Sequence, residues 1–341
     1  MERHHHPIDP SNPDPELLAR AGQALRDGLL VAFPTETVYG LGARADQDAP
    51  VEAIYRAKGR PGRNPLIVHV AGLEEARALA LAWSSEAEAL ARAFWPGPLT
   101  LVALGVPGTV STKVTAGGPT VALRVPSHPV ALGLVRAAGV PVAAPSANRY
   151  QHLSPTLAEH VHKSLGDRVQ WILDGGPCAL GLESSVVDTT TTPPTLLRPG
   201  ALCLARLQSV VPALALHAPP APSLEPSRSP GLEARHYAPS VPLRVLPGRD
   251  IHAFLRVNTD LTVGVVLCRE RYECTHRAPV ERLGAEPERY GAALYASLHR
   301  LEDLGCDLIL VEEPPNEPAW ATVTDRLRRA SEPSRSGGAP P

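Results

Sequence analysis

The stretch GLLVAFPTETVYGLG, residues 28–42, does most to decide the fold. Its apolar first half, which ends at Pro34, predicts a buried strand. The polar side chains that follow this strand belong to Thr35, Glu36, Thr37 and Tyr39. In α/β sheets, polar residues at such a strand end commonly line a ligand crevice. Capping of the next helix by Thr35 or Thr37 is the alternative.

Strands and helices alternate on both sides of this stretch. Apolar residues at helical spacing predict helices over residues 15–27, 49–58, 74–82 and 85–93, and Asp14 before Pro15 predicts the N-cap of the first of them. The segments that predict further strands are PLIVHV, LTLVALG, TVALRVP, VPVAAPS, QWILDGG and SSVVDTT. This alternation predicts α/β layers built on a mixed sheet.

A proline-rich segment divides the chain. Residues 211–231 lack hydrophobic periodicity and predict a linker. Beyond it, the strands VPLRVL, LTVGVVLC and CDLILVEEP, with helices over 287–304 and 320–329, predict a small α/β unit of Rossmann-like order. The expected organisation is a first domain over residues 15–205, a linker over 206–240, a second domain over 241–332, and flexible tails at 1–14 and 333–341.

Composition narrows the class of protein. The 341 residues suit about two domains, and the net charge of −2 gives no global attraction to nucleic acid. The five cysteines never form a CxxC pair, which argues against a disulfide framework and a structural zinc site. The uncharged stretches fall short of the ~20 apolar residues of a membrane span, and the start of the chain carries no apolar signal core. We therefore expect a cytoplasmic protein.

Cations gather in the segment KGRPGRNPL, which carries Lys58, Arg60 and Arg63. Short loops of this kind hold anions, because cations and backbone N–H groups both point at the ligand. A solvated helix exit is the alternative. The sequence has neither a GxxxxGK[ST] loop nor a GxGxxG loop, so a nucleotide bound here would use an unconventional cradle.

Other polar residues stand at the ends of predicted strands. Arg124 lies between apolar neighbours, so it needs a carboxylate or phosphate partner; an internal salt bridge is the alternative. Similar positions are taken by Ser146, Asn148, Ser184, Ser185 and Arg198. The hydroxyls have no nearby histidine in sequence. Together these residues predict a pocket of cations and hydroxyls suited to transfer chemistry on a charged nucleotide.

The order of these segments is similar to one known family. PTETVYGLGA, KGRPGRNPLIVHV, WPGPLTLV, TVALRVPSHP, PSAN with SPT, GLESSVVD and LLRPG, over about residues 15–205, resemble the YrdC-type threonylcarbamoyl-AMP synthases. The segment SPGLEARHYAP, residues 229–239, and the unit after it resemble the family's long form. The resemblance implies a twisted mixed sheet around a large, positively charged cavity, with a Rossmann-like C-terminal domain.

The resemblance also implies an activity. Members condense L-threonine, bicarbonate or CO2, and ATP into L-threonylcarbamoyl-AMP and pyrophosphate. A separate tRNA threonylcarbamoyl transferase uses that product to modify the adenosine beside the anticodon. Mg²⁺ is expected to be held mainly by ATP phosphates and water, without protein ligands. Weak binding of tRNA is a further expectation.

Site residues follow from the matched motifs. The signature residues implied by the resemblance are Lys58, Arg60, Ser146 and Asn148. ATP contacts are expected from Arg60, Asn64, Thr120, Ser146, Ser154 and Arg198, with His236 and Tyr237 reaching over from the linker. Threonine contacts are expected from Thr37, His69, Arg124, Ala144 and Ser184. In this hypothesis Arg124 holds the threonine carboxylate, and the linker is a lid that excludes water during adenylation.

Two departures from the family pattern bear on function. RYQHLSPT, residues 149–156, stands where a small residue and glycine usually precede SPT, and Ser185 replaces a usual threonine. A non-catalytic RNA- or nucleotide-binding paralogue therefore stays an alternative. A carbamoyltransferase with a YrdC-like domain is a second one, although such proteins usually carry an additional domain.

Overall fold

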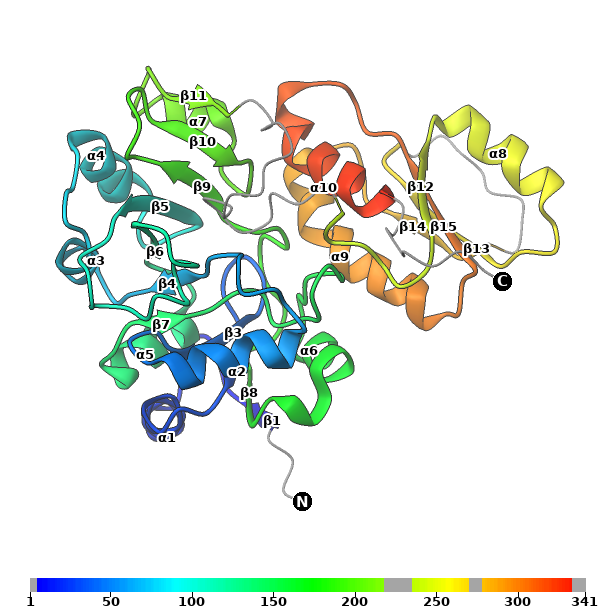
Figure 1. Cartoon of the computed structure of the whole chain (residues 1–341). Helices are drawn as coiled ribbons and strands as arrows, with labels where there is room; N and C mark the ends of the chain where they lie inside the picture. Colours follow the sequence, from blue (N-terminus) through cyan, green and yellow to red (C-terminus); the bar gives the residue numbers. More distant parts are fainter. Residues whose placement is uncertain (1–4, 218–234, 270–277, 333–341) are drawn as a thin grey trace, which may run out of the picture. The chain divides into compact units, whose positions relative to one another are not determined.

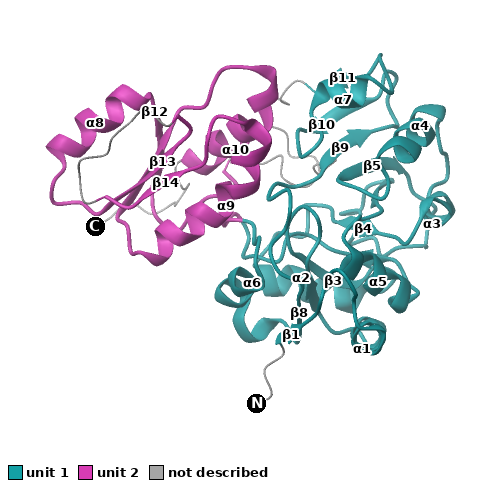
Figure 2. Ribbon diagram, turned by 180° about the vertical axis from the view of Figure 1, so that it is seen from behind, with its two compact units in different colours: residues 1–150, 154–232 teal, residues 151–153, 233–341 magenta. Residues whose placement is uncertain are grey.

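The computed structural model describes residues 5–217, 235–269 and 278–332 (Figure 1). The chain forms two compact units, each with its own sheet (Figure 2). The first consists of residues 1–150 and 154–232, and the second of residues 151–153 and 233–341. Residues 151–153 thus belong to the second unit although the chain around them belongs to the first.

The first unit is built on a mixed sheet of order β1-β8-β2-β3-β7-β4-β6-β5-β9-β10-β11 among the described residues. The strands are β1 (His5–Pro7), β2 (Val31–Phe33), β3 (Gly40–Arg44), β4 (Ile67–His69), β5 (Leu99–Leu104), β6 (Thr120–Arg124), β7 (Val142–Ala143), β8 (Trp171–Asp174), β9 (Ser185–Asp188), β10 (Thr195–Arg198) and β11 (Ala215–Leu216). Neighbouring strands β4 and β6 run parallel, with His69 beside Arg124. This register sets the ends of two strands side by side.

Helices cover both faces of this sheet. They are α1 (Pro15–Arg26), α2 (Asp48–Lys58), α3 (Leu73–Leu79), α4 (Ser85–Phe94), α5 (Pro129–Ala138), α6 (Ala158–Leu165), the short η1 (Gly166–Arg168) and α7 (Leu204–Gln208). Helix α1 begins as predicted, because Asp14 Oδ1 accepts the N–H of Glu16 at 2.9 Å. Helix α2 ends at Gly59, whose φ of 63° suits glycine.

The core of the first unit divides by sheet face. Helices α1 and α5 pack with Val31 and Phe33, whereas the alternate residue Ala32 packs with α2 and α6. Figure 1 shows α1 and α5 as neighbours. Gly22 makes this possible, since a Cβ there would lie 2.7 Å from the carbonyl carbon of Ala137. The backbones of the two helices are therefore in contact.

The second unit has a four-stranded parallel sheet of order β12-β15-β13-β14. Its elements are β12 (Leu243–Leu246), α8 (Gly248–Val257), β13 (Val263–Leu267), β14 (Val280–Arg282), α9 (Pro287–Asp303), β15 (Leu308–Glu312), η2 (Pro318–Trp320) and α10 (Ala321–Ser331). Helix α8 packs on one face, and Leu301 of α9 packs against Gly264 on the other. Because β15 lies between β12 and β13, the order differs from Rossmann folds, whose first two strands are adjacent.

Several expectations about the chain's organisation need correction. Residues 5–7 of the expected flexible tail form β1, which pairs with β8, and the ring of His6 stacks on Trp171 with centroids 4.4 Å apart. Residues 206–217 of the expected linker belong to the first unit, because Leu207 and Leu214 are buried in its core. Residues 218–234 and 333–341 lie outside the described residues. No helix in the described part of the chain is long and apolar enough to cross a membrane.

Candidate functional site

His69 and Arg124 end the neighbouring strands β4 and β6, and both are buried, at 2% and 4% exposure. Each has a buried nitrogen, His69 Nδ1 and Arg124 Nε, that has no hydrogen-bond partner among the described residues. Burial, and then the nearby charge of Arg124, lower the pKa of His69 to about 3. A neutral imidazole and a cation with an unused N–H therefore lie together. Buried polar groups without partners are costly, which makes this pair a candidate for ligand binding.

The other side of Arg124 is already engaged. Its Nη2 donates to Glu36 Oε1 at 2.7 Å and to Thr37 Oγ1 at 2.9 Å. Glu36 Oε2 in turn accepts the backbone N–H of Ser127. The internal salt bridge considered from sequence is thus present. It fixes the guanidinium and leaves Nε–H for another acceptor.

Lys58 is buried at the end of α2, as expected of a signature residue rather than of a solvated helix exit. Its Nζ donates to the carbonyl oxygens of Ser146 and Asn148 at 2.5 Å each and lies 3.4 Å from Asn148 Oδ1. Burial, and then Arg60, lower the pKa of Lys58. The three oxygens oppose this shift, because they match the three protons of an ammonium group. Lys58 thus ties the predicted signature residues together.

Two polar residues of the segment after Lys58, Arg60 and Asn64, are also buried, whereas Arg63 is exposed. Arg60 Nη2 donates to the Pro65 carbonyl at 3.1 Å, and Asn64 Nδ2 donates to the hydroxyl of Tyr150 at 3.1 Å. Tyr150 also donates its backbone N–H to the Lys58 carbonyl. The departure RYQH therefore contributes Tyr150 to this cluster. It leaves the Lys58 contacts in place.

A third cluster surrounds the motif GLESSVVD. Arg198 Nη2 donates to the Ser184 carbonyl at 2.9 Å, and Ser184 Oγ lies 2.8 Å from Thr100 Oγ1. Gly200 allows the backbone after Arg198 to pass close to the backbone of Ser185, because a Cβ at Gly200 would lie 2.3 Å from the Ser185 nitrogen. Ser185 keeps the hydroxyl that threonine would supply and donates it to the Leu202 carbonyl. The hydroxyl of Ser185 is therefore engaged within the fold.

Backbone hydrogen bonds connect these clusters. Ala144 donates its N–H to Ile67 in β4, and Ala147 donates to Tyr39. The segment that carries Ala144, Ser146 and Asn148 thus joins β4 to the polar stretch after β2. Predicted site residues of the first unit that the structure buries are Thr37, Lys58, Arg60, Asn64, His69, Arg124, Ala144, Asn148, Ser154, Ser184 and Arg198.

Some predicted residues lie apart from this group. Thr120 begins β6 while Arg124 ends it, about 13 Å along the strand. Asn64, just before β4, is at the same end as Thr120. Asn64 and Thr120, both expected at ATP, therefore lie at the opposite end of the strand pair from His69 and Arg124, which are expected at threonine. His236 and Tyr237 belong to the second unit.

Two acidic residues were missed as site members. Glu36 pairs with Arg124, and Glu183 Oε1 accepts the hydroxyl of Ser154 at 2.6 Å. Both stand inside motifs quoted from the sequence. The signal that could have identified them is an acidic residue next to hydroxyl residues at the end of a predicted strand. Within residues 5–217, 235–269 and 278–332 no group of three or more His, Cys, Asp or Glu side chains could hold a metal ion.

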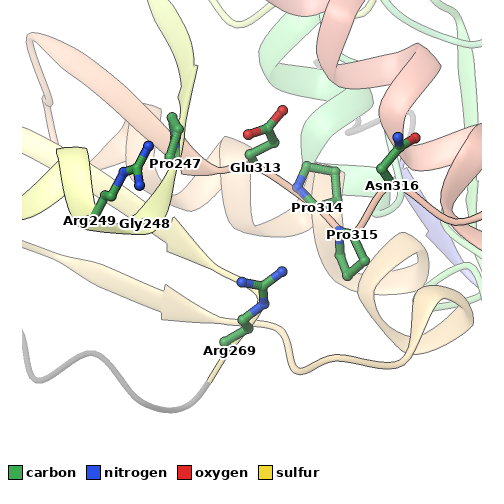
Figure 3. A pocket seen from close by; sticks show the side chains of 8 residues that line it. All are labelled: Pro247, Gly248, Arg249, Arg269, Glu313, Pro314, Pro315 and Asn316. Carbon is green, nitrogen blue, oxygen red and sulfur yellow. The ribbon is translucent and has the colours of Figure 1, made fainter.

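The second unit has a pocket of about 370 Å³ at the carboxyl ends of β12, β13 and β15 (Figure 3). It is lined by Pro247, Gly248, Arg249, Arg269, Glu313, Pro314, Pro315 and Asn316. Arg249 is 85% exposed and lies 3.6 Å from Asp250. This pocket shares no residue with the site predicted from sequence.

Comparison with known proteins identifies the family. Residues 23–200 match a family model described as telomere recombination and named for Sua5, YciO and YrdC. Residues 203–332 match the model described as the C-terminal domain of threonylcarbamoyl-AMP synthase. The chain belongs to the threonylcarbamoyl-AMP synthase family. The family predicted from the motifs is confirmed, and the second match confirms the long form.

Relatives of this synthase family match nearly the whole chain. Threonylcarbamoyl-AMP synthase of Bacillus subtilis is 39% identical and covers 94% of both chains. The synthase of Pyrococcus abyssi is 41% identical over 90% of this chain and 92% of its own. The crystal structure of P. abyssi Sua5 complexed with L-threonine superposes with a TM-score of 0.89 at 38% identity, covering 96% of this chain and 97% of that one. The predicted mixed α/β fold is therefore confirmed, while the large basic cavity stays a prediction.

Proposed function

We propose that this chain condenses L-threonine, bicarbonate or CO2, and ATP into L-threonylcarbamoyl-AMP and pyrophosphate. One observation carries the proposal beyond family membership. His69 and Arg124, side by side at two strand ends, each keep a buried nitrogen that has no hydrogen-bond partner in the part of the chain that the structure describes. A ligand with a carboxylate and a nearby amine supplies what both groups lack. A relative of this chain has been crystallised with L-threonine.

Arg124 binds the threonine carboxylate in this proposal. Its Nε–H donates to the carboxylate, while Glu36 and Thr37 keep the guanidinium oriented through Nη2. Charge-assisted hydrogen bonds of this kind are among the strongest in proteins. His69 is neutral at pH 7 because its pKa is about 3, so it adds no second positive charge beside the threonine amine.

The reaction then needs a cationic environment at phosphate. The neutral threonine amine forms a carbamate, either with CO2 and loss of a proton or with bicarbonate and loss of water. A carbamate oxygen then attacks the α-phosphorus, and the bond to pyrophosphate breaks as pyrophosphate leaves. Negative charge gathers at that centre, and positioned cations lower its energy in the transition state. Lys58, Arg60 and Arg198 are the cations that we assign to this role. Mg²⁺, bound through the ATP phosphates, would neutralise part of the same charge.

The remaining expected contacts complete the proposal. Asn64, Thr120, Ser146 and Ser154 hold ATP, and the linker that carries His236 and Tyr237 closes over the nucleotide. The product passes to a tRNA threonylcarbamoyl transferase in the cytoplasm, with weak tRNA binding by this chain. Relatives named as synthases favour this enzyme over the non-catalytic paralogue.

Pyrophosphate release by the purified full chain tests the activity. We expect release only when ATP, L-threonine and bicarbonate are all present. Arg60→Ala should lower the rate about a hundredfold, because one donor to the transition state is lost. Arg124→Ala should instead raise the KM for L-threonine about a hundredfold, because it removes a buried charged partner of the carboxylate.

Arg136→Ala is the matched control, since Arg136 is an exposed residue of α5. It should leave both quantities unchanged. Release without L-threonine would assign another acceptor. ATP binding without release under any condition would support the non-catalytic paralogue.

A further inference from the structure

Tyr237 has an unusual backbone conformation for a bulky residue. Its φ is 60°, in the left-handed region that favours glycine. This conformation is unfavourable for a residue with a side chain, so surrounding contacts must hold it. Only 1% of Tyr237 is exposed. Strained, buried residues of this kind concentrate at functional sites.

Three side chains of the second unit surround the Tyr237 ring. The guanidinium carbon of Arg326, in α10, lies 4.7 Å from the ring centroid. The ring of Tyr295, in α9, stacks at a centroid distance of 6.0 Å, and the neighbouring His236 ring lies at 4.0 Å. Arg326 is itself 1% exposed and is paired with Asp325 at 2.7 Å. A buried cation over an aromatic face is a strong contact, because water does not compete for it.

The backbone is held on both sides of Tyr237. On one side His236 donates its N–H to the Arg329 carbonyl in α10 at 3.2 Å. On the other side Ala238 donates its N–H to the Gln151 carbonyl at 2.9 Å, and His152 forms a parallel bridge with Ala238. Gln151 belongs to the RYQH departure from the family pattern. Residues 151–153 and Ala238 lie in the same compact unit.

We infer that Tyr237 is a positioning residue of the linker, held in a clamp made by Arg326, Tyr295 and the segment 151–153. The inference rests on the proposed synthase function, in which the linker closes over the nucleotide. A ring that is 1% exposed and covered by Arg326 and Tyr295 offers no open surface to ATP. The clamp therefore acts through the placement of His236, and all of its members belong to the second unit.

A double-mutant cycle in the full chain tests the clamp. Tyr237→Ala and Arg326→Met should each raise the KM for ATP about tenfold or more, since a small misplacement of a closing element is costly. The double variant should be no worse than either single variant, because the two residues act as one unit. The KM for L-threonine should stay within about twofold, as Arg124 is untouched.

Conservative variants separate positioning from simple loss of structure. Tyr237→Phe and Arg326→Lys keep the ring and the cation, so both should retain the wild-type KM for ATP within about threefold. Arg328→Met is the matched control on the same helix, because Arg328 is 56% exposed and shares Asp325. It should change nothing. Should Arg326→Met fail to fold, Tyr295→Leu removes the opposite contact and must give the same rise.

A readout without catalysis separates this inference from the proposed function. In wild type the amides of His236 and Ala238 should be protected from hydrogen exchange, and Arg326→Met should release both. If the wild-type chain has no synthase activity but Arg326→Met still loses this protection, the proposed function is overturned and the clamp stands. Normal kinetics and unchanged protection in Arg326→Met would overturn the clamp, as would additive effects in the cycle.

Discussion

The pair Arg124 and Glu36 brings two charges into the interior of the first unit, where their side chains are 5% and 9% exposed. Each charge depends on the other, because an ion without a partner in a protein interior costs several kcal/mol. Among the described residues, the Nε–H of Arg124 has no hydrogen-bond acceptor. The guanidinium that we propose to bind threonine is therefore one on which the stability of the fold also depends.

Removal of Glu36 should reveal this dependence. Glu36→Ala strands the Arg124 charge, so we expect the free energy of unfolding to fall by about 3–5 kcal/mol. Urea unfolding measures this change. Glu74→Ala is the control, since Glu74 pairs with Arg77 at 2.6 Å but is 82% exposed, and it should cost about 0.5 kcal/mol or less. Equal effects of the two substitutions would contradict the buried pair.

His69 should make stability depend on pH. Its folded-state pKa of about 3 lies below the ordinary value of 6.5, so the unfolded chain binds the proton first as the pH falls. The stabilisation is complete above about pH 6.5 and is lost progressively as the pH falls towards 3. At pH 4 the loss in the free energy of unfolding amounts to about 3 kcal/mol. Urea unfolding of wild type and His69→Gln between pH 4 and 7 measures it. The variant should show the shallower decline, and parallel curves would exclude His69 as the cause.

At the scale of elements, the contact between α1 and α5 depends on Gly22. A Cβ at this position would lie 2.7 Å from the Ala137 carbonyl carbon and 2.8 Å from its oxygen. Since both atoms are backbone, the helices must separate, and we expect Gly22→Ala to lower the free energy of unfolding by about 1–3 kcal/mol. Gly62→Ala is the control, because a Cβ there meets nothing within 4 Å. Thermal unfolding of both variants decides the matter, and a neutral Gly22→Ala would refute the close approach.

Elements with their own local signals could be predicted from sequence. Asp14 and Pro15 fix the start of α1, and apolar runs reveal β4 and β6. Strand β1 carries no such signal, because its sequence HHP pairs only where β8 offers an edge. Helices α5, α6 and α8 were not predicted either, although their apolar spacing was available. The strand order of the second unit depends on which strand inserts between two others, and no local pattern states that.

The candidate site shows the same division. Position and type identified Lys58 and Arg124, because buried cations at element ends need partners. The choice of Glu36 as the partner of Arg124 joins residues 88 positions apart, so only the folded chain reveals it. The clamp on Tyr237 is likewise non-local. The sequence identifies which buried groups require a partner, whereas only the folded structure shows which residue is that partner.

For the whole molecule, the two units should unfold as separate bodies. Within the described residues, the hydrophobic cluster around Val265 and Leu310 in the second unit shares no side chain with the clusters of the first unit. Calorimetry of the full chain should therefore resolve two transitions. Saturating L-threonine should raise the Tm of one by about 5 °C and leave the other in place. A single transition that moves as a whole would show one cooperative molecule.

The segment 151–153 has a consequence for any attempt to divide the protein. Cleavage within residues 218–234 gives two polypeptides whose ends do not coincide with the folded units. The amino-terminal fragment contains Gln151, whose carbonyl accepts the N–H of Ala238 in the carboxyl-terminal fragment. The carboxyl-terminal fragment therefore lacks a segment of its own folded unit, and we expect this unit to assemble fully only when both fragments are present.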